Sequence, residues 1–65
     1  MKVREVIRLI EQDGWRKVSQ EGSHRQFKHY AKPGRVTVAG HPSVDVPIGT
    51  LKNIYRQAQI QEKKP

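Results

Sequence analysis

One histidine beside a glycine-containing turn is the residue of this chain best suited to chemistry. His24 follows Gly22 and Ser23 and begins a stretch, up to Tyr30, that is typical of a β-strand. An imidazole titrates near neutrality, so it can take a proton from a hydroxyl group or give one to a leaving group. This chemistry indicates RNA as the substrate, because RNA is a polyanion that carries its own nucleophile, the 2′-hydroxyl.

The charge of the chain favours a polyanionic partner. Its 65 residues include 13 Lys and Arg but six Asp and Glu, which gives a formal net charge of +7. The basic residues are spread along the whole sequence, which predicts a folded domain with a positive surface instead of a basic tail. Such a surface attracts phosphate chains in a salt-dependent manner.

Cations near His24 are needed to offset the charge that develops on a phosphate in the transition state. Strand alternation directs Phe27 to the core and His24 and Lys28 to the opposite, open face. Arg25 is expected to face inward near the strand end and to reach the rim, so Lys28 is the preferred cation. The expected RNA contacts, through backbone N–H groups, the hydroxyl, cations and base stacking, are Gly22, Ser23, Arg25, Lys28, Tyr30 and Lys32.

His41 is the second histidine with a possible functional role. It lies in a loop beside Pro42, and two roles stay open for it: a second proton-transfer group, or a contact to a partner. No metal or other cofactor is expected, because the histidines and acidic residues lack the spacing of known ligand sets.

A helix, three strands and a second helix must position these residues. The first helix is expected from Val3 to Asp13, with Gly14 after its end, since apolar residues recur along one helix face. Strands are expected at 15–19, 24–30 and 35–39, joined by turns at 20–23 and 31–34. After a loop at 40–49, Thr50 is expected to cap a helix whose apolar stripe is Leu51, Ile54, Tyr55 and Ala58.

This order predicts an α+β fold, α-β-β-β-α, in which both helices cover one face of a three-stranded antiparallel sheet. Residues 1–60 are expected to form a single domain, followed by a polar tail at 61–65. No apolar run is long enough for a signal peptide or a membrane span, and cysteine is absent. We therefore expect a cytoplasmic protein without a membrane partner.

The chain resembles the HicA toxin family from its first helix to Ile60. The resemblance rests on the order and spacing of Gly22-Ser23-His24 with Phe27, Val36-Thr37-Val38, and Gly49-Thr50-Leu51 with Ile54 and Gln57-Ala58. It implies a fold like the double-stranded-RNA-binding domain and a metal-independent endoribonuclease that acts on messenger RNA. It also implies that His24 holds the catalytic position and that a HicB antitoxin keeps the enzyme inactive by covering the active site.

Two positions depart from the family pattern. Ile48 precedes Gly49 where a polar residue is expected, and the second helix ends in Ala58-Gln59-Ile60 instead of Ala-Gly-Ile. The first departure removes a possible phosphate contact, and neither affects His24.

The residues leave three functions open: an RNA-cleaving toxin, an RNA-binding module of the same fold without catalysis, and a component of a larger assembly. Surface cations would serve each of them. His24 distinguishes the first two, because only cleavage requires proton transfer.

Overall fold

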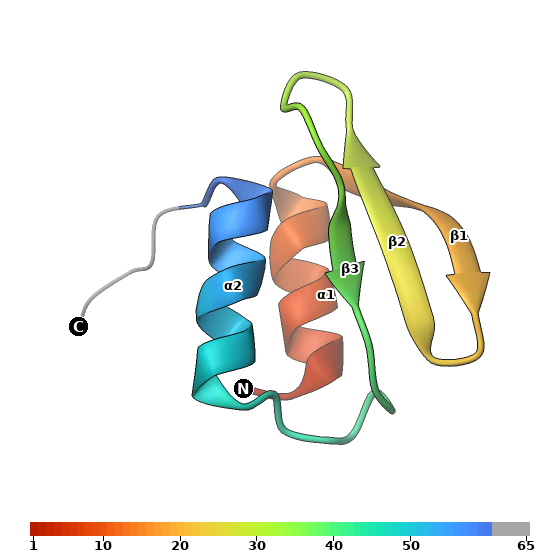
Figure 1. Cartoon of the computed structure of the whole chain (residues 1–65), viewed down its shortest axis with the longest axis vertical. Helices are drawn as coiled ribbons and strands as arrows, with labels where there is room; N and C mark the ends of the chain where they lie inside the picture. Colours follow the sequence, from red (N-terminus) through yellow and green to blue (C-terminus); the bar gives the residue numbers. More distant parts are fainter. Residues whose placement is uncertain (61–65) are drawn as a thin grey trace.

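The predicted order of elements is confirmed by a computed structural model, which describes residues 1–60. Helix α1 (Val3–Gln12) precedes strands β1 (Trp15–Glu21), β2 (His24–His29) and β3 (Val36–Val38), and helix α2 (Ile48–Ala58) follows (Figure 1). The sheet order is β1-β2-β3, and both strand pairs are antiparallel. The fold is therefore α+β with an α-β-β-β-α order. The polar tail expected at 61–65 lies outside the described residues.

A single apolar core joins both helices to one face of the sheet. Phe27, on the central strand, is fully buried, and so are Val36 and Val38 on the neighbouring strand. The indole of Trp15 is buried as well, and its Nε1–H donates a hydrogen bond to the Ala58 carbonyl at 3.2 Å, which satisfies its polar atom. The complete buried set is Val3, Val6, Ile10, Trp15, Phe27, Val36, Val38, Ile54 and Ala58. The opposite face of the sheet is left open.

Helix α1 has the expected buried face and the expected end. At its start, the backbone N–H of Lys2 donates to the Glu5 carboxylate at 2.7 Å, so an acidic side chain lies at the positive end of the helix dipole. At its end, Gly14 has φ +109° and its N–H donates to the Glu11 carbonyl at 3.0 Å. Gly14 closes the helix as predicted, since this backbone conformation strains residues with a Cβ.

The hairpin between β1 and β2 is tighter than predicted. The predicted turn at 20–23 was wrong in extent, because pairing continues to Glu21, which lies directly opposite His24. The turn itself is only Gly22-Ser23, and Gly22 has φ +57°, as the first central residue of a type II′ turn requires. The register shifts between Lys17 and Ser19, which marks a β-bulge at Val18.

Two other boundaries differ from the prediction. Strand β2 ends at His29, so Tyr30 lies outside it, and β3 is shorter than 35–39 at both ends. Helix α2 begins at Ile48, and Thr50 therefore does not cap it. Pro47 holds the capping position instead, with an extended backbone, and its carbonyl accepts the Leu51 N–H at 2.9 Å.

The segment between β3 and α2 is attached to the start of the chain. The Val3 N–H donates to the Val44 carbonyl at 2.9 Å, and the Arg4 N–H donates to the Pro42 carbonyl at 3.1 Å. The Val46 N–H donates to the Met1 carbonyl at 2.8 Å. These bonds draw the loop toward α1, on the helix side of the sheet.

Candidate functional site

His24 is the first residue of β2 and lies on the open face of the sheet. Phe27, three residues later, points to the core and is 0 % exposed, so alternation places His24 on the opposite side. The side chain of His24 is exposed. In Figure 1 the turn that precedes it lies at the lower end of the β1–β2 hairpin, away from both helices. The imidazole is therefore accessible to a large substrate.

Two side chains hold the turn that precedes His24. The amide of Gln20 donates to the Gly22 carbonyl at 3.0 Å. The guanidinium of Arg25 donates to the Ser23 carbonyl at 3.1 Å and to the Gly40 carbonyl at 3.0 Å. Arg25 is half-buried and faces inward at the strand end, as strand alternation predicts. Its guanidinium links the turn to the loop after β3.

His41 follows Gly40 in that loop and lies at the same end of the sheet as His24. Its Nδ1 lies 2.9 Å from the Ser43 hydroxyl, and the side chain is exposed. Arg25 thus joins the segment before His24 to the segment before His41. Both roles that the sequence leaves open for His41 are compatible with this position.

A row of three cations crosses the open face at the other end of the sheet. Arg16 on β1 and Lys28 on β2 are directly opposite each other. Continuing the β2–β3 register by one position beyond Phe27 and Val36 places Arg35 beside Lys28. We call Arg16, Lys28 and Arg35 the cationic row; within residues 1–60 none of them forms an ion pair.

The cationic row is unfavourable for folding on its own. Like charges directly opposite each other in a sheet are destabilising. Within residues 1–60, the row makes a side-chain hydrogen bond to the neighbouring Gln26, whose side-chain oxygen accepts from the Arg35 guanidinium at 2.6 Å. Lys28 lies four residues from His24 along β2, or about 13 Å in an extended strand. The structure therefore places the predicted cation on the same face as His24 but not in contact with it.

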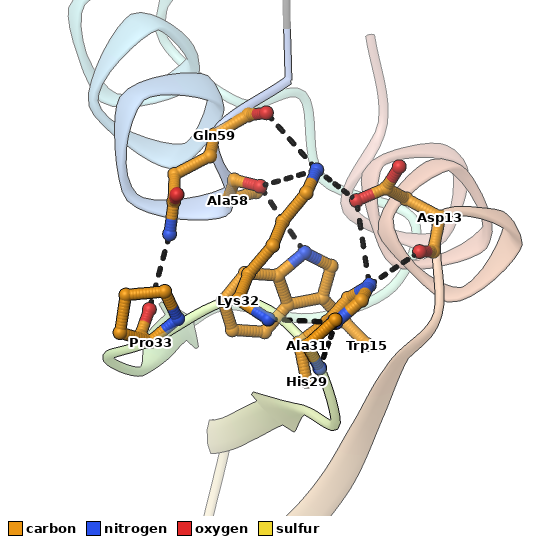
Figure 2. A network of polar contacts seen from close by, with 8 residues as sticks. All are labelled: Asp13, Trp15, His29, Ala31, Lys32, Pro33, Ala58 and Gln59. Atoms are coloured by element: carbon orange, nitrogen blue, oxygen red, sulfur yellow. Dashed lines mark hydrogen bonds and ion pairs between the residues drawn. The ribbon is translucent and has the colours of Figure 1, made fainter.

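Lys32 and Tyr30 are not brought together with His24. Both lie in the loop between β2 and β3, at the opposite end of the sheet from the Gly22-Ser23 turn (Figure 1). The ammonium of Lys32 donates to the Asp13 carboxylate at 2.6 Å and to the carbonyls of Ala58 and Gln59 at 3.3 and 3.0 Å (Figure 2). Lys32 therefore links the ends of the two helices. Tyr30 is 93 % exposed and its ring stacks on His29 at a centroid distance of 4.8 Å.

His29 occupies the centre of this helix-end network. Its Nδ1 accepts the backbone N–H groups of Ala31 at 2.9 Å and Lys32 at 3.1 Å. Nε2 must then carry the hydrogen that is donated to the Asp13 carbonyl at 2.6 Å (Figure 2). His29 is thus a neutral structural residue, with 5 % of its side chain exposed.

The same network changes the acidity of Asp13. The hydrogen bond from the Lys32 ammonium lowers the pKa of the Asp13 carboxyl below its ordinary value of 3.8, against the opposing effect of burial. The positive charge of Lys32 acts in the same direction. Asp13 is therefore held ionised as the anchor of the Lys32 contact.

The described part of the chain shows neither a cluster of metal ligands nor a membrane-spanning helix. Within residues 1–60, no three His, Cys, Asp or Glu side chains lie close enough together to hold a metal ion. Over the same residues, no helix has the length and apolar character needed to cross a membrane.

Glu21 is the residue at this site that the sequence interpretation missed. The prediction placed it in a four-residue turn, where its direction is undefined. A Gly-Ser pair also fits a two-residue hairpin, and that reading would have placed Glu21 across from His24.

The fold and the site together define a small basic α+β protein that presents a histidine and a row of cations on an open sheet face. A family model described as the HicA toxin of bacterial toxin–antitoxin systems matches residues 3–60. The chain belongs to this family, and it is the toxin component of a toxin–antitoxin system whose expected partner is a HicB antitoxin. A search of curated proteins finds no match to the chain.

Proposed function

We propose that this HicA protein is an endoribonuclease that cleaves messenger RNA without a metal ion, with His24 as a proton-transfer group. The observation that carries the proposal is the exposed position of His24 on the open sheet face, in a chain of the HicA toxin family. The imidazole of His24 is exposed and is not part of the apolar core. Within residues 1–60 it also forms no hydrogen bond with the protein, so no structural role accounts for it. Messenger RNA as the substrate implies action in the cytoplasm.

The proposed reaction is an internal transesterification. The 2′-oxygen attacks the neighbouring phosphorus and loses its proton to a base, while the bond from phosphorus to the 5′-oxygen breaks. The leaving oxygen keeps the electron pair and receives a proton from an acid, so the products are a 2′,3′-cyclic phosphate and a 5′-hydroxyl. An imidazole can serve as the base or the acid of this reaction.

The open sheet face supplies a surface for the RNA backbone. The cationic row has no ion-pair partner within residues 1–60, so its charges are available to bind RNA phosphates. Such binding is favourable because the Lys and Arg side chains release the counterions that surround the phosphates. We include Lys28 in the row and add the turn at Gly22 and Ser23 as a contact close to His24. Arg25 acts by holding that turn. Tyr30 is exposed and follows Lys28 by two residues at the same end of the sheet, so it stays a candidate for base stacking, whereas Lys32 is already bonded to Asp13.

We propose that the HicB-type antitoxin inhibits the enzyme by covering this face. A protein with net charge +7 favours an acidic partner, and contact with His24, Lys28 and the 40–49 loop would exclude the substrate.

The test is cleavage of a labelled transcript in EDTA by the wild-type protein and by His24→Ala. We expect the wild type to release fragments with 2′,3′-cyclic phosphate ends and the variant to release none. Because His24 is exposed, the variant should keep its melting temperature. A wild-type protein that binds the transcript but never cuts it would instead identify an RNA-binding module without catalysis.

A further inference from the structure

We propose that Glu21 is the second proton-transfer group of this site and acts as the partner of His24. The proposal rests on the RNA cleavage proposed above and names the residue that completes the reaction. Transesterification needs a base at the 2′-oxygen and an acid at the 5′-oxygen, and one imidazole supplies one of the two in a single step.

The hairpin register places Glu21 and His24 next to each other. They are directly opposite across a two-residue turn, so their side chains leave the sheet on the same face. Directly opposed residues have Cβ atoms about 4.5–5.5 Å apart. Both side chains are exposed, and within residues 1–60 neither forms an ion pair or a hydrogen bond with the other. The carboxylate and the imidazole are thus both free to contact a phosphodiester placed over the turn.

The chemistry of Glu21 is unusual for its position. Glu21 is the only acidic residue in the three strands of the sheet. On a face that binds phosphates, a carboxylate opposes binding, so its placement directly across from the histidine calls for a role in the reaction. The charged and titratable groups of the surrounding elements are Arg16 and Lys17 on β1, His24, Arg25, Lys28 and the inward-facing His29 on β2, Arg35 before β3, and His41 and Asp45 in the loop.

His41 is less well placed than Glu21 for the second role. Its loop is bonded to the start of α1 through Pro42 and Val44, which directs the chain toward the helix side of the sheet. The Nδ1 atom of His41 is also engaged by Ser43. Glu21, in contrast, is held on the open face by strand pairing itself.

In the proposed step, the ionised Glu21 carboxylate takes the proton of the 2′-hydroxyl as the 2′-oxygen bonds to phosphorus. The bond from phosphorus to the 5′-oxygen breaks, and the protonated His24 imidazole gives its proton to that oxygen. The step leaves a neutral Glu21 carboxylic acid and a neutral His24, and exchange with water restores both. Activity therefore requires Glu21 to be ionised and His24 to be protonated, which predicts a bell-shaped dependence on pH.

The experiment measures single-turnover cleavage of a labelled transcript against pH for the wild type, Glu21→Gln and the control Glu11→Gln. Glu11 is an exposed residue of helix α1, on the other side of the sheet. Glu11→Gln removes the same charge as Glu21→Gln, so it controls for the change in net charge. We expect Glu21→Gln to lower the rate by about 10²-fold or more and to abolish the fall in rate at acidic pH. Glu11→Gln should match the wild type, and all three proteins should melt at the same temperature.

Three outcomes would overturn the role of Glu21 while leaving the proposed ribonuclease intact. They are wild-type rates in Glu21→Gln, a lower rate of Glu21→Gln that still falls at acidic pH, and, in a fourth protein measured in the same way, loss of the acidic fall in His41→Ala. If the wild type does not cleave RNA at all, the proposed function itself fails. The wild-type and His24→Ala reactions therefore separate the two failures.

Discussion

The Arg25 guanidinium donates a hydrogen bond of 3.0 Å to the carbonyl of Gly40, fifteen residues further along the chain. The same nitrogen donates to the Ser23 carbonyl at 3.1 Å, directly before His24. One side chain of β2 therefore controls the distance between the hairpin turn and the loop that carries His41. Arg25 is a positioning residue, and its effect on a reaction would pass through these two segments.

Replacing Arg25 by lysine should loosen the loop while keeping the charge. One ammonium on a flexible stem does not reproduce the planar set of guanidinium donors, and losing a charged hydrogen bond costs about 1.5–3 kcal/mol. Hydrogen exchange should become faster for the backbone N–H groups around the 40–46 loop and less affected in β1. Unchanged exchange in the loop would show that its bonds to the start of α1 hold it without Arg25.

Changing Lys28 in the cationic row should weaken RNA binding and stabilise the fold. Lys28→Gln removes a phosphate contact, so the slope of log affinity against log salt should become smaller by about one unit. It also removes a like-charge pair with Arg16, which should raise the free energy of unfolding by about 0.2–1 kcal/mol.

Binding would be measured in a His24→Ala background, so that the RNA stays intact. The matched control is Lys52→Gln, because Lys52 is an exposed lysine on α2, away from the open sheet face. If RNA affinity depends on salt equally in Lys28→Gln and Lys52→Gln, the cationic row is not part of the RNA-binding surface.

Asp13 should make stability depend on acidic pH. Its pKa is lower in the folded chain than the ordinary value of 3.8, so the folded state binds this proton less tightly than the unfolded state. Its stabilising contribution is complete above that value and is lost as pH falls through the lower folded pKa. Asp13→Asn should therefore be less stable than the wild type at pH 7, and the difference should shrink as the pH falls below the ordinary Asp pKa of 3.8. Urea unfolding at pH 7 and at the lower pH checks this, with Glu11→Gln as the charge control.

Gly14→Ala should be more damaging than the same change at Gly34. Both glycines have positive φ, +109° and +86°, so both alanines carry a backbone strain of about 1–2 kcal/mol. Only at Gly14 would the new Cβ meet a neighbour, the His29 Nε2 at 2.7 Å, whereas Gly34 has open space. Moving His29 would break its bond to Asp13.

Thermal melting of the two alanine variants measures this difference. A loss of 1 kcal/mol corresponds to about 4–8 °C in a domain of this size. We expect Gly14→Ala to melt clearly below Gly34→Ala. Equal melting temperatures would mean that the helix-end network adapts to the added methyl group.

The sequence predicts the fold well because local patterns and turn residues agree with one another. The spacing of Val3, Val6 and Ile10 predicts α1, and Gly14 predicts its end, both of which the structure confirms. The predicted start of α2 was wrong by three residues, since Thr50 is a good capping residue by type but the helix is capped at Pro47. The chain instead begins the helix after Pro47, whose extended backbone ends the loop earlier.

The site is less predictable, because it depends on register and on the ends of strands. Alternation correctly places His24 and Lys28 on the open face. It does not show that β1 continues to Glu21, or that Arg16 lies opposite Lys28, because both follow from the two-residue turn and the bulge at Val18. Lys32 is near His24 in sequence, yet the length of β2 carries it to the far end of the sheet.

The helix-end network around Asp13, His29 and Lys32 has a consequence for how rigidity is distributed in the molecule. It joins α1, the end of β2 and the end of α2 at one pole, while the Gly22-Ser23 turn lies at the opposite end of the sheet, to the side of the helices (Figure 1). Transient local opening should therefore begin at the hairpin tip and reach the network last. Substitutions of the exposed side chains at the tip should therefore affect folding less than substitutions at the opposite pole, so the surface of the tip can change while the opposite pole preserves the fold.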